Sequence, residues 1–418
     1  PLIDELPMAL ERELLSYDAE EKRIGTDELI LYKVGLQVAS INKMIDHMIE
    51  QPADYPLKAS WLQTVNTITC GSVDNERTIE AFDKLEFNVV VDLFMTPMAM
   101  RLGDLFLPVC TYGERNGIRC GDGTQRGETI NAAVPPAGES RSDMEINLEM
   151  GRRFNPEAWP WESVEEMFST ILEPSGMDFE QVRETAPSYL PFQYRKYEKG
   201  LLRPDGQPGF STETGRAEIY SMVFHHTSWS GLDPLPSYVE PVESPYSNPD
   251  ALAELPYIVT SGARVPHFFH SEQRQVKKLR ALYPDPLCYI HPETAAKHGI
   301  EEGDWMWLEN QHGKCKYKAK FDENYDPRVM QCDHGWWFPE RKDQAEENVE
   351  DEKAGLFGVF ESQINNLVPF DAGVSGFGSN YKSMMCRIYK DGETPAPLTV
   401  GIPAPESIKI DTEDRPVA

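Results

Sequence analysis

One stretch of the sequence concentrates residue types that bind anions. Residues 260–273 read Thr-Ser-Gly-Ala-Arg-Val-Pro-His-Phe-Phe-His-Ser-Glu-Gln and directly follow a predicted strand. An arginine can hold a phosphate through two parallel hydrogen bonds, and a glycine lets a ligand approach the backbone. The segment therefore predicts an anion-binding loop. The alternative is a polar loop stabilised by its own turn chemistry.

Two further clusters have the composition of a binding site. Residues 333–340 read Asp-His-Gly-Trp-Trp-Phe-Pro-Glu, and residues 376–382 join a Gly-rich turn to Lys382. Paired tryptophans most often belong to a hydrophobic core, and a single lysine most often lies at the surface. Neither cluster predicts a function by itself.

The motifs of several common enzyme classes are absent from the sequence. It contains no G-x-S-x-G, no G-x-x-x-x-G-K-[ST] and no H-E-x-x-H. His267 and His270 are three residues apart, but no acidic or cysteine partner lies at zinc-ligand spacing. The seven cysteines include no C-x-x-C pair, which excludes a ferredoxin-type cluster formed by this chain alone. They favour reduced thiols in a reducing or anaerobic setting.

The first part of the chain has the pattern of an α/β domain. A helix is predicted over 27–49, strands over 59–65, 88–93 and 104–109, and a helix over 74–85. The continuous apolar run of Val89, Val90 and Val91 is typical of a parallel strand covered on both faces. Residues 112–137 are predicted to form a long loop. At Ser142 a capping box predicts a helix, whereas the alternation over 144–150 predicts a strand.

The second part of the chain begins after a Pro-rich boundary over 233–254 and changes to short strands and tight turns. Before that boundary, short helices are predicted over 160–168 and 178–184. Strands over 257–260, 305–308 and 316–321, with a helix over 292–297, predict a compact β-barrel. The acidic run 344–353 is predicted to be a solvated loop.

Charge excludes two classes of partner. The 418 residues carry a formal net charge of −29, so nucleic acid and anionic membrane surfaces are not expected partners. No apolar run approaches the roughly 20 residues that a membrane-spanning helix requires, so direct membrane insertion is not expected. The chain starts at Pro1 without a signal sequence, and we expect it to be a fragment of a longer protein.

Taken in order, these segments resemble the molybdopterin oxidoreductases of the dimethyl sulfoxide reductase family. The matching motifs lie at 90–97, 104–108, 114–117, 135–143, 212–221, 257–273, 290–295, 303–304, 334–337 and 381–382. The resemblance implies the remainder of an α/β (Rossmann-like) domain over 1–232 and a Pro-rich linker over 233–254. It then implies a double-psi β-barrel that binds molybdopterin dinucleotide over 255–400, and a tail over 401–418.

The resemblance also implies a cofactor, bis-molybdopterin guanine dinucleotide with molybdenum or tungsten. Carried over by position, the contacts of the α/β part are Asn66, Val91, Asp92, Arg115 and Asp143. Those of the barrel are Ser261, Gly262, Arg264, His270, Ser271, Asn365 and Lys382, and His334 and Trp336 line the approach to the metal. The carboxylate of Asp92 or Asp143 can accept hydrogen bonds from both edge donors of guanine. We expect the contacts of the α/β part to lie close together, and those of the barrel to lie close together as well.

The family's [4Fe-4S] cluster and protein metal ligand belong to a part that precedes this region, so no catalytic or metal-ligating residue is assigned. The chain is interpreted as the C-terminal part of an oxidoreductase acting on a small molecule, and the reactions considered are reductive dehydroxylation or a related reaction on an organic substrate. An iron-sulfur electron-transfer subunit is the expected partner, and location in the cytoplasm or export by a twin-arginine signal both stay open. One alternative is a non-catalytic subunit that holds cofactor or docks a partner. The other is a barrel whose motifs match by chance.

Overall fold

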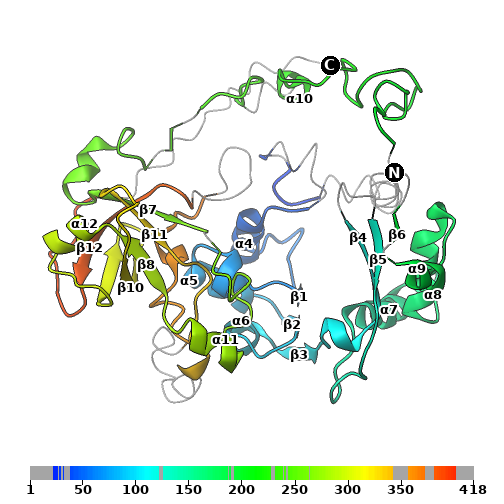
Figure 1. Ribbon diagram of the computed structural model, residues 1–418, viewed down its shortest axis with the longest axis horizontal. Coiled ribbons are helices and arrows are strands. Elements are labelled where there is room, and N and C mark those ends of the chain that lie inside the picture. Colours follow the sequence, from blue (N-terminus) through cyan, green and yellow to red (C-terminus); the bar gives the residue numbers. More distant parts are fainter. Residues whose placement is uncertain are drawn as a thin grey trace. The chain divides into compact units, whose positions relative to one another are not determined.

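The computed structural model describes most of the chain and divides it into two compact units (Figure 1). It describes residues 22–401 except 27, 30–31, 33–37, 122–125, 187, 190–192, 227–230, 239, 242, 263, 342–355 and 372–380. One unit contains residues 89–95 and 104–222, and the other contains 24–88, 96–103 and the chain from 223 onward. No helix in the described ranges is both long and apolar enough to cross a membrane. The predicted acidic loop 344–353 and Gly-rich turn 376–380 lie outside the described residues.

The segment before the barrel in the second unit is a set of short helices and one strand. It comprises α4 (Ile41–Glu50), β1 (Ala59–Gln63), the π-helix η1 (Thr67–Gly71), α5 (Asn75–Asp83) and α6 (Pro97–Leu102). Arg77 of α5 bonds Asp46 of α4, and Arg101 of α6 makes a two-bond ion pair with Asp83 of α5. Residues 27, 30–31 and 33–37 of the predicted helix over 27–49 lie outside the described residues, and after extended backbone at Ser40 its second part is observed as α4.

The other unit carries a parallel strand pair and a small antiparallel sheet. Strands β2 (Phe87–Asp92) and β3 (Leu105–Pro108) run parallel, with Val91 opposite Leu107. Strands β4 (Gly117–Gly121), β5 (Arg126–Ile130) and β6 (Ser188–Tyr189) form the antiparallel sheet. The predicted loop over 112–137 is therefore wrong in its centre. The hairpin is stabilised by Ile118 of β4, which packs against the core of the three helices that complete this unit.

Three helices complete this unit. They are α7 (Asp143–Phe154), α8 (Val164–Leu172) and α9 (Phe179–Thr185). Ser142 accepts a hydrogen bond from the Glu145 amide, and the Glu145 carboxylate accepts one from the Ser142 amide. The capping box thus decides between the two readings of residues 142–150, because it satisfies helix donors that a strand would leave to other partners.

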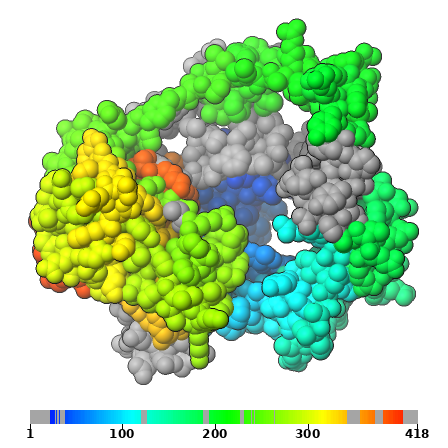
Figure 2. Space-filling view, viewed as in Figure 1, coloured from blue at the N-terminus to red at the C-terminus, as the bar shows by residue number. Residues whose placement is uncertain are grey.

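The barrel of the second unit is a closed sheet of six strands, coloured from yellow-green at β7 to red-orange at β12 in Figures 1 and 2. Its strands are β7 (Tyr257–Ser261), β8 (Leu287–Ile290), β9 (Trp305–Glu309), β10 (Lys314–Phe321), β11 (Val329–Cys332) and β12 (Met384–Lys390). The order around the barrel is β10-β8-β11-β7-β12-β9, with two parallel pairs, β11·β7 and β10·β8. Helix α12 (Pro292–Lys297) lies where the sequence predicts a helix. The predictions of an α/β part and a β-barrel are confirmed.

The barrel interior contains four buried thiols, and this leads to a labelling prediction. Cys288, Cys315, Cys332 and Cys386 are fully buried, Cys110 of the other unit is buried, and Cys70 is half-buried. In a Cys120→Ser chain at pH 8, iodoacetamide should label Cys70 alone before denaturation and all six thiols afterwards. Burial raises the pKa of Cys70, so its labelling should be slower than that of a free thiol. Peptide mass spectrometry provides the measurement, and native labelling of a barrel thiol would contradict the described packing.

Candidate cofactor-binding site

The barrel topology brings three predicted segments to one edge. Strands β7 and β11 are parallel neighbours, with Ser261 at the end of β7 opposite Cys332 at the end of β11. The loops that follow, 262–274 and 333–338, therefore leave the barrel at the same edge. Strand β12 is antiparallel to β7, so residues 381–383 just before it lie at that edge too.

The first two loops meet through a pair of histidines. Nδ1 of His270 lies 2.9 Å from Nε2 of His334, and both rings are half-buried. One of these nitrogens carries the hydrogen and donates it to the other. Nε1 of Trp337 donates to the Ser271 carbonyl at 2.8 Å, which joins the loops a second time. The loops approach so closely that a Cβ added at Gly335 would lie 2.9 Å from the Ser271 amide nitrogen.

Two cationic side chains lie at the same edge of the barrel. The guanidinium of Arg264 lies 4.8 Å from the ring centre of Phe269, whose ring is itself 4.7 Å from that of His270. Lys382 is bonded through Nζ to the Ser261 carbonyl, and both Arg264 and Lys382 are exposed. Gly262 has φ +96°, and a Cβ there would lie 2.6 Å from the Lys382 Nζ. Glycine is favoured at this position because L side chains rarely adopt its backbone angle, whereas the flexible end of the lysine can move aside.

Two residues of this edge were not predicted from the sequence. The π-helix η1 carries Cys70, whose pKa is raised by burial and lowered by the charge of Arg274 and the backbone amide of Ser271. Arg274 is 1% exposed and donates to the backbone carbonyls of His270 and His334. Single-turn π-helices often occur at functional sites, but no sequence pattern announces one.

Some residues that were predicted to contact the cofactor have side chains that bond or pack within the protein. The Asn365 amide donates to the carbonyls of Cys70 and Ser72, so it ties residues 364–367 to η1. Trp336 is fully buried and packs with Phe268 and Phe338, so its side chain does not reach solvent at this edge. Asn66 caps η1 by accepting from the Thr69 amide.

The α/β unit has its own cluster at the carboxyl ends of two strands. Asp92 ends β2, and its backbone carbonyl accepts a hydrogen bond from Val109 at 3.1 Å. The Cys110 amide donates to the Arg141 carbonyl at 2.9 Å, so the start of α7, with Asp143, lies beside the end of β3. Val91 is 1% exposed and its side chain packs in the core, which leaves only its backbone for a ligand.

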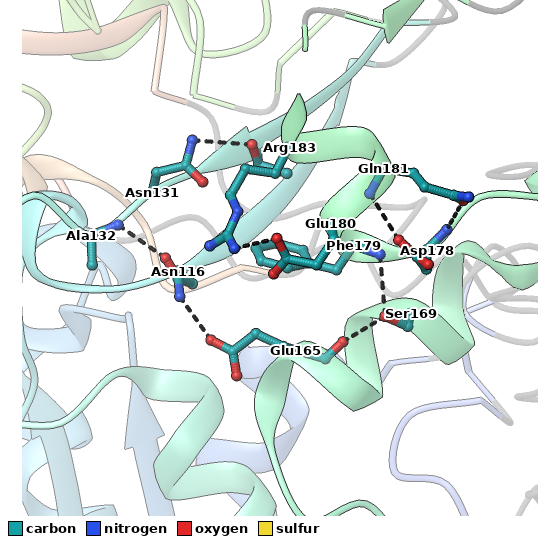
Figure 3. Close-up of polar contacts among 11 residues, drawn as sticks. Asn116, Asn131, Ala132, Glu165, Ser169, Asp178, Phe179, Glu180, Gln181 and Arg183 are labelled. Atoms are coloured by element: carbon teal, nitrogen blue, oxygen red, sulfur yellow. Dashed lines mark hydrogen bonds and ion pairs between the residues drawn. The ribbon is translucent and has the colours of Figure 1, made fainter. Parts of the chain in front are cut away.

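Arg115 belongs to this cluster and is held by its neighbour. Burial raises the pKa of Cys110, and the positive charge of Arg115 lowers it. The next residue, Asn116, donates to Glu165 of α8 at 2.7 Å and accepts from the Ala132 amide at 3.0 Å (Figure 3). This double anchor fixes the backbone from which Arg115 projects. That Asp92, Arg115 and Asp143 bind one guanosine end together stays a prediction.

The described residues contain no group of three or more His, Cys, Asp or Glu side chains placed to hold a metal ion. What the barrel edge offers is a set of hydrogen-bond donors and positive charges around a glycine. Such donors suit phosphate groups, for which arginine and lysine provide charge and histidine provides a ring N–H.

Comparisons with known proteins agree with this reading. Residues 32–153 match the family "Molybdopterin oxidoreductase", and residues 257–382 match "Molydopterin dinucleotide binding domain". Dopamine dehydroxylase of Eggerthella lenta is 28% identical over 92% of this chain and 43% of its own length. Acetylene hydratase of Syntrophotalea acetylenica is 31% identical over 69% of this chain and 38% of its own. The solved structure of acetylene hydratase from Pelobacter acetylenicus matches 90% of this chain and 53% of its own, with a TM-score of 0.78 and 25% identity.

These matches place the chain in an enzyme class, the molybdopterin-dependent oxidoreductases. Within that class, the chain belongs to the dimethyl sulfoxide reductase family and is a portion of a catalytic subunit. It spans less than half the length of these curated relatives.

Proposed function

We propose that this chain holds a bis-molybdopterin guanine dinucleotide carrying molybdenum or tungsten, as the C-terminal part of an oxidoreductase acting on a small organic molecule. The observation that carries the proposal is the barrel edge, where His270, His334, Arg264 and Lys382 gather around Gly262 and Gly335. These residues fit the phosphates of the dinucleotide, because a phosphate is bound by positive charge, by hydrogen-bond donors and by glycine backbone that it can approach closely. When bound, the cofactor supplies the redox chemistry, and the protein supplies binding and electrostatics.

The α/β unit is proposed to bind a guanosine end. Asp92 and Asp143 each offer a carboxylate that can accept from the N1–H and N2–H donors of guanine. Arg115 contributes positive charge for the adjoining phosphates. Because Asn116 is anchored on both sides, Arg115 reaches the ligand from a backbone that is already ordered.

We further propose reductive dehydroxylation, or a related reaction on an organic substrate, as the activity of the whole protein. The two similar proteins named dopamine dehydroxylase and acetylene hydratase support this range of substrates. An iron-sulfur electron-transfer subunit and a [4Fe-4S] cluster elsewhere in the full protein belong to the same proposal.

The cofactor proposal is tested on the full-length protein purified without oxygen. Plasma mass spectrometry should find about one molybdenum or tungsten per polypeptide, and acid hydrolysis should release about two guanosine monophosphates. The double variant Arg264→Ala/Lys382→Met should retain several-fold less nucleotide, because it removes two charges that face the phosphates. Lys390→Met is the matched control, since Lys390 lies at the last position of β12, away from Lys382 before its first, and pairs with Asp304. Folded wild-type protein with neither metal nor guanosine would contradict the proposal.

The substrate is tested separately by incubating the metal-loaded protein with catechols and a low-potential electron donor. Mass spectrometry should detect a product that has lost one oxygen atom. Loaded protein that converts no catechol but hydrates or reduces another small molecule would keep the cofactor proposal and overturn the dehydroxylation.

A further inference from the structure

Arg274 occupies an unusual position for a charged side chain. It is 1% exposed, and its guanidinium carbon lies 4.7 Å from the ring centres of both Phe268 and Trp336. Burial lowers its pKa to about 10, and the charge of Asp333 acts in the opposite direction. A buried charge is costly, and an apolar side chain of similar volume would fill the space between two rings at less cost. The position therefore uses something that only a guanidinium supplies.

That property is the planar fork of donors. Nη1 of Arg274 donates to the His270 carbonyl, and Nη2 donates to the His334 carbonyl at 3.0 Å. These carbonyls belong to the two residues whose rings bond each other at 2.9 Å. One rigid side chain thus sets the distance between the backbones from which both histidines project. A lysine offers donors without this fixed geometry.

The backbone at the same place leaves little freedom. His270 has φ +51° and Gly335 has φ +64°, so both loops turn through the left-handed region where they meet. A non-glycine residue keeps such a conformation only where its surroundings impose it. For His270, the hydrogen bond from Arg274 to its carbonyl is one such constraint.

We propose that Arg274 is the positioning residue of the His270–His334 pair, holding the two loops at the separation that lets the rings share one hydrogen. The function of the pair toward phosphate rests on the proposed cofactor site, whereas the geometry of the pair does not. Arg274 touches neither substrate nor cofactor in this role and acts through the two histidines. Its removal should release the rings while the barrel stays closed, because the strand pairing involves none of these side chains.

Arg280 provides a matched control because it contacts the same Trp336 ring. Its guanidinium carbon lies 4.9 Å from the Trp336 ring centre, close to the corresponding distance for Arg274. Its donors go to Glu340 and to the carbonyls of Tyr283 and Pro284, not to the histidine loops. Arg280→Met therefore removes a similar cation from the same ring and leaves the histidine backbones tied.

The test compares Arg274→Met, Arg274→Lys and Arg280→Met in the full-length protein labelled with ¹⁵N-histidine. In wild type and Arg280→Met, NMR should show an imidazole N–H proton that exchanges slowly with water, from the bond between the rings. In Arg274→Met this proton should exchange at least tenfold faster, and Arg274→Lys should restore part of the protection. Guanosine content, measured in parallel, should fall several-fold only in Arg274→Met. Thermal unfolding reports whether each variant is folded.

Three results would overturn the inference: unchanged exchange in folded Arg274→Met, equal loss in Arg280→Met, or full protection in Arg274→Lys. If Arg274→Met does not fold, the lysine variant decides, because it keeps the charge and loses the fork. Absence of guanosine from wild type with the expected exchange pattern would contradict the cofactor proposal and leave the role of Arg274 supported.

Discussion

Gly335→Ala is expected to lower the free energy of unfolding by about 3 kcal/mol and to abolish guanosine retention. The added Cβ would lie 2.9 Å from the Ser271 amide nitrogen and 3.0 Å from the His270 carbonyl carbon. These are backbone atoms, so the two loops have to separate before the methyl group fits. Separation stretches both the histidine pair and the bond from Trp337 to the Ser271 carbonyl. Urea unfolding and nucleotide analysis measure the two effects.

A matched glycine separates backbone strain from collision. Gly299 has φ +60°, close to the +64° of Gly335, but a Cβ at Gly299 meets no atom within 4 Å. Gly299→Ala should therefore cost only about 1–2 kcal/mol, the penalty of left-handed backbone in an L-residue. Equal destabilisation in both variants would show that the two loops do not pack as closely as described.

Local chemistry explains which elements the sequence predicts well. Helix α12 was predicted with its observed bounds, because a proline opens it and Gly299 follows it. The predicted strands at 88–93 and 305–308 agree with β2 and β9 to within one residue at each end. In these segments the apolar pattern and the turn residues favour the same element. The capping box at Ser142 prevailed over an alternating pattern for a similarly local reason.

Elements that depend on distant partners could not be predicted in the same way. Strands β8 and β11 have four residues each, and their identity comes from pairing with strands far along the chain. The hairpin β4–β5 lies in a glycine-rich stretch, and its strands are stabilised by pairing with each other and by the packing of Ile118 against the core of α7, α8 and α9. The residues of a short polar segment do not by themselves indicate which distant strands or helices it will contact.

The residues of the candidate site show the same difference between local patterns and distant partners. The motif at 260–273 identifies the barrel loop, because its residue types are unusual in an acidic chain. Arg274, one residue beyond that motif, was missed because its partners are two backbone carbonyls, one of them 60 positions away. Cys70 was missed because its neighbours Ser271 and Arg274 lie about 200 positions along the sequence. Asn365 and Trp336 show the reverse, since the family resemblance assigns them to the cofactor site, whereas the Asn365 amide bonds backbone carbonyls and Trp336 packs in a buried cluster.

Asp333 should make the stability of the barrel depend on pH in the direction opposite to an ordinary carboxylate. It is 1% exposed, and burial raises its pKa to about 6 against the lowering effects of the Leu287 amide, the Tyr283 hydroxyl and the Arg274 charge. In the unfolded chain an aspartate has a pKa near 3.9. Between these values the folded state binds more protons than the unfolded state, so rising pH lowers the free energy of unfolding. The loss is complete above about pH 7 and is on the order of 3 kcal/mol at most.

Asp333→Asn isolates this contribution. Both hydrogen bonds to Asp333, from Tyr283 Oη and the Leu287 amide at 2.9 Å each, end on Oδ2, so the amide oxygen of asparagine can accept both. Urea unfolding from pH 4 to 7.5 should show wild type losing stability relative to Asp333→Asn as the pH rises through 6. Tyr283→Phe should shift that loss to higher pH, because the bond it removes holds the carboxyl pKa down. Parallel stability curves for wild type and Asp333→Asn would mean that the carboxyl is already ionised well below pH 6, in contact with water that the described packing excludes.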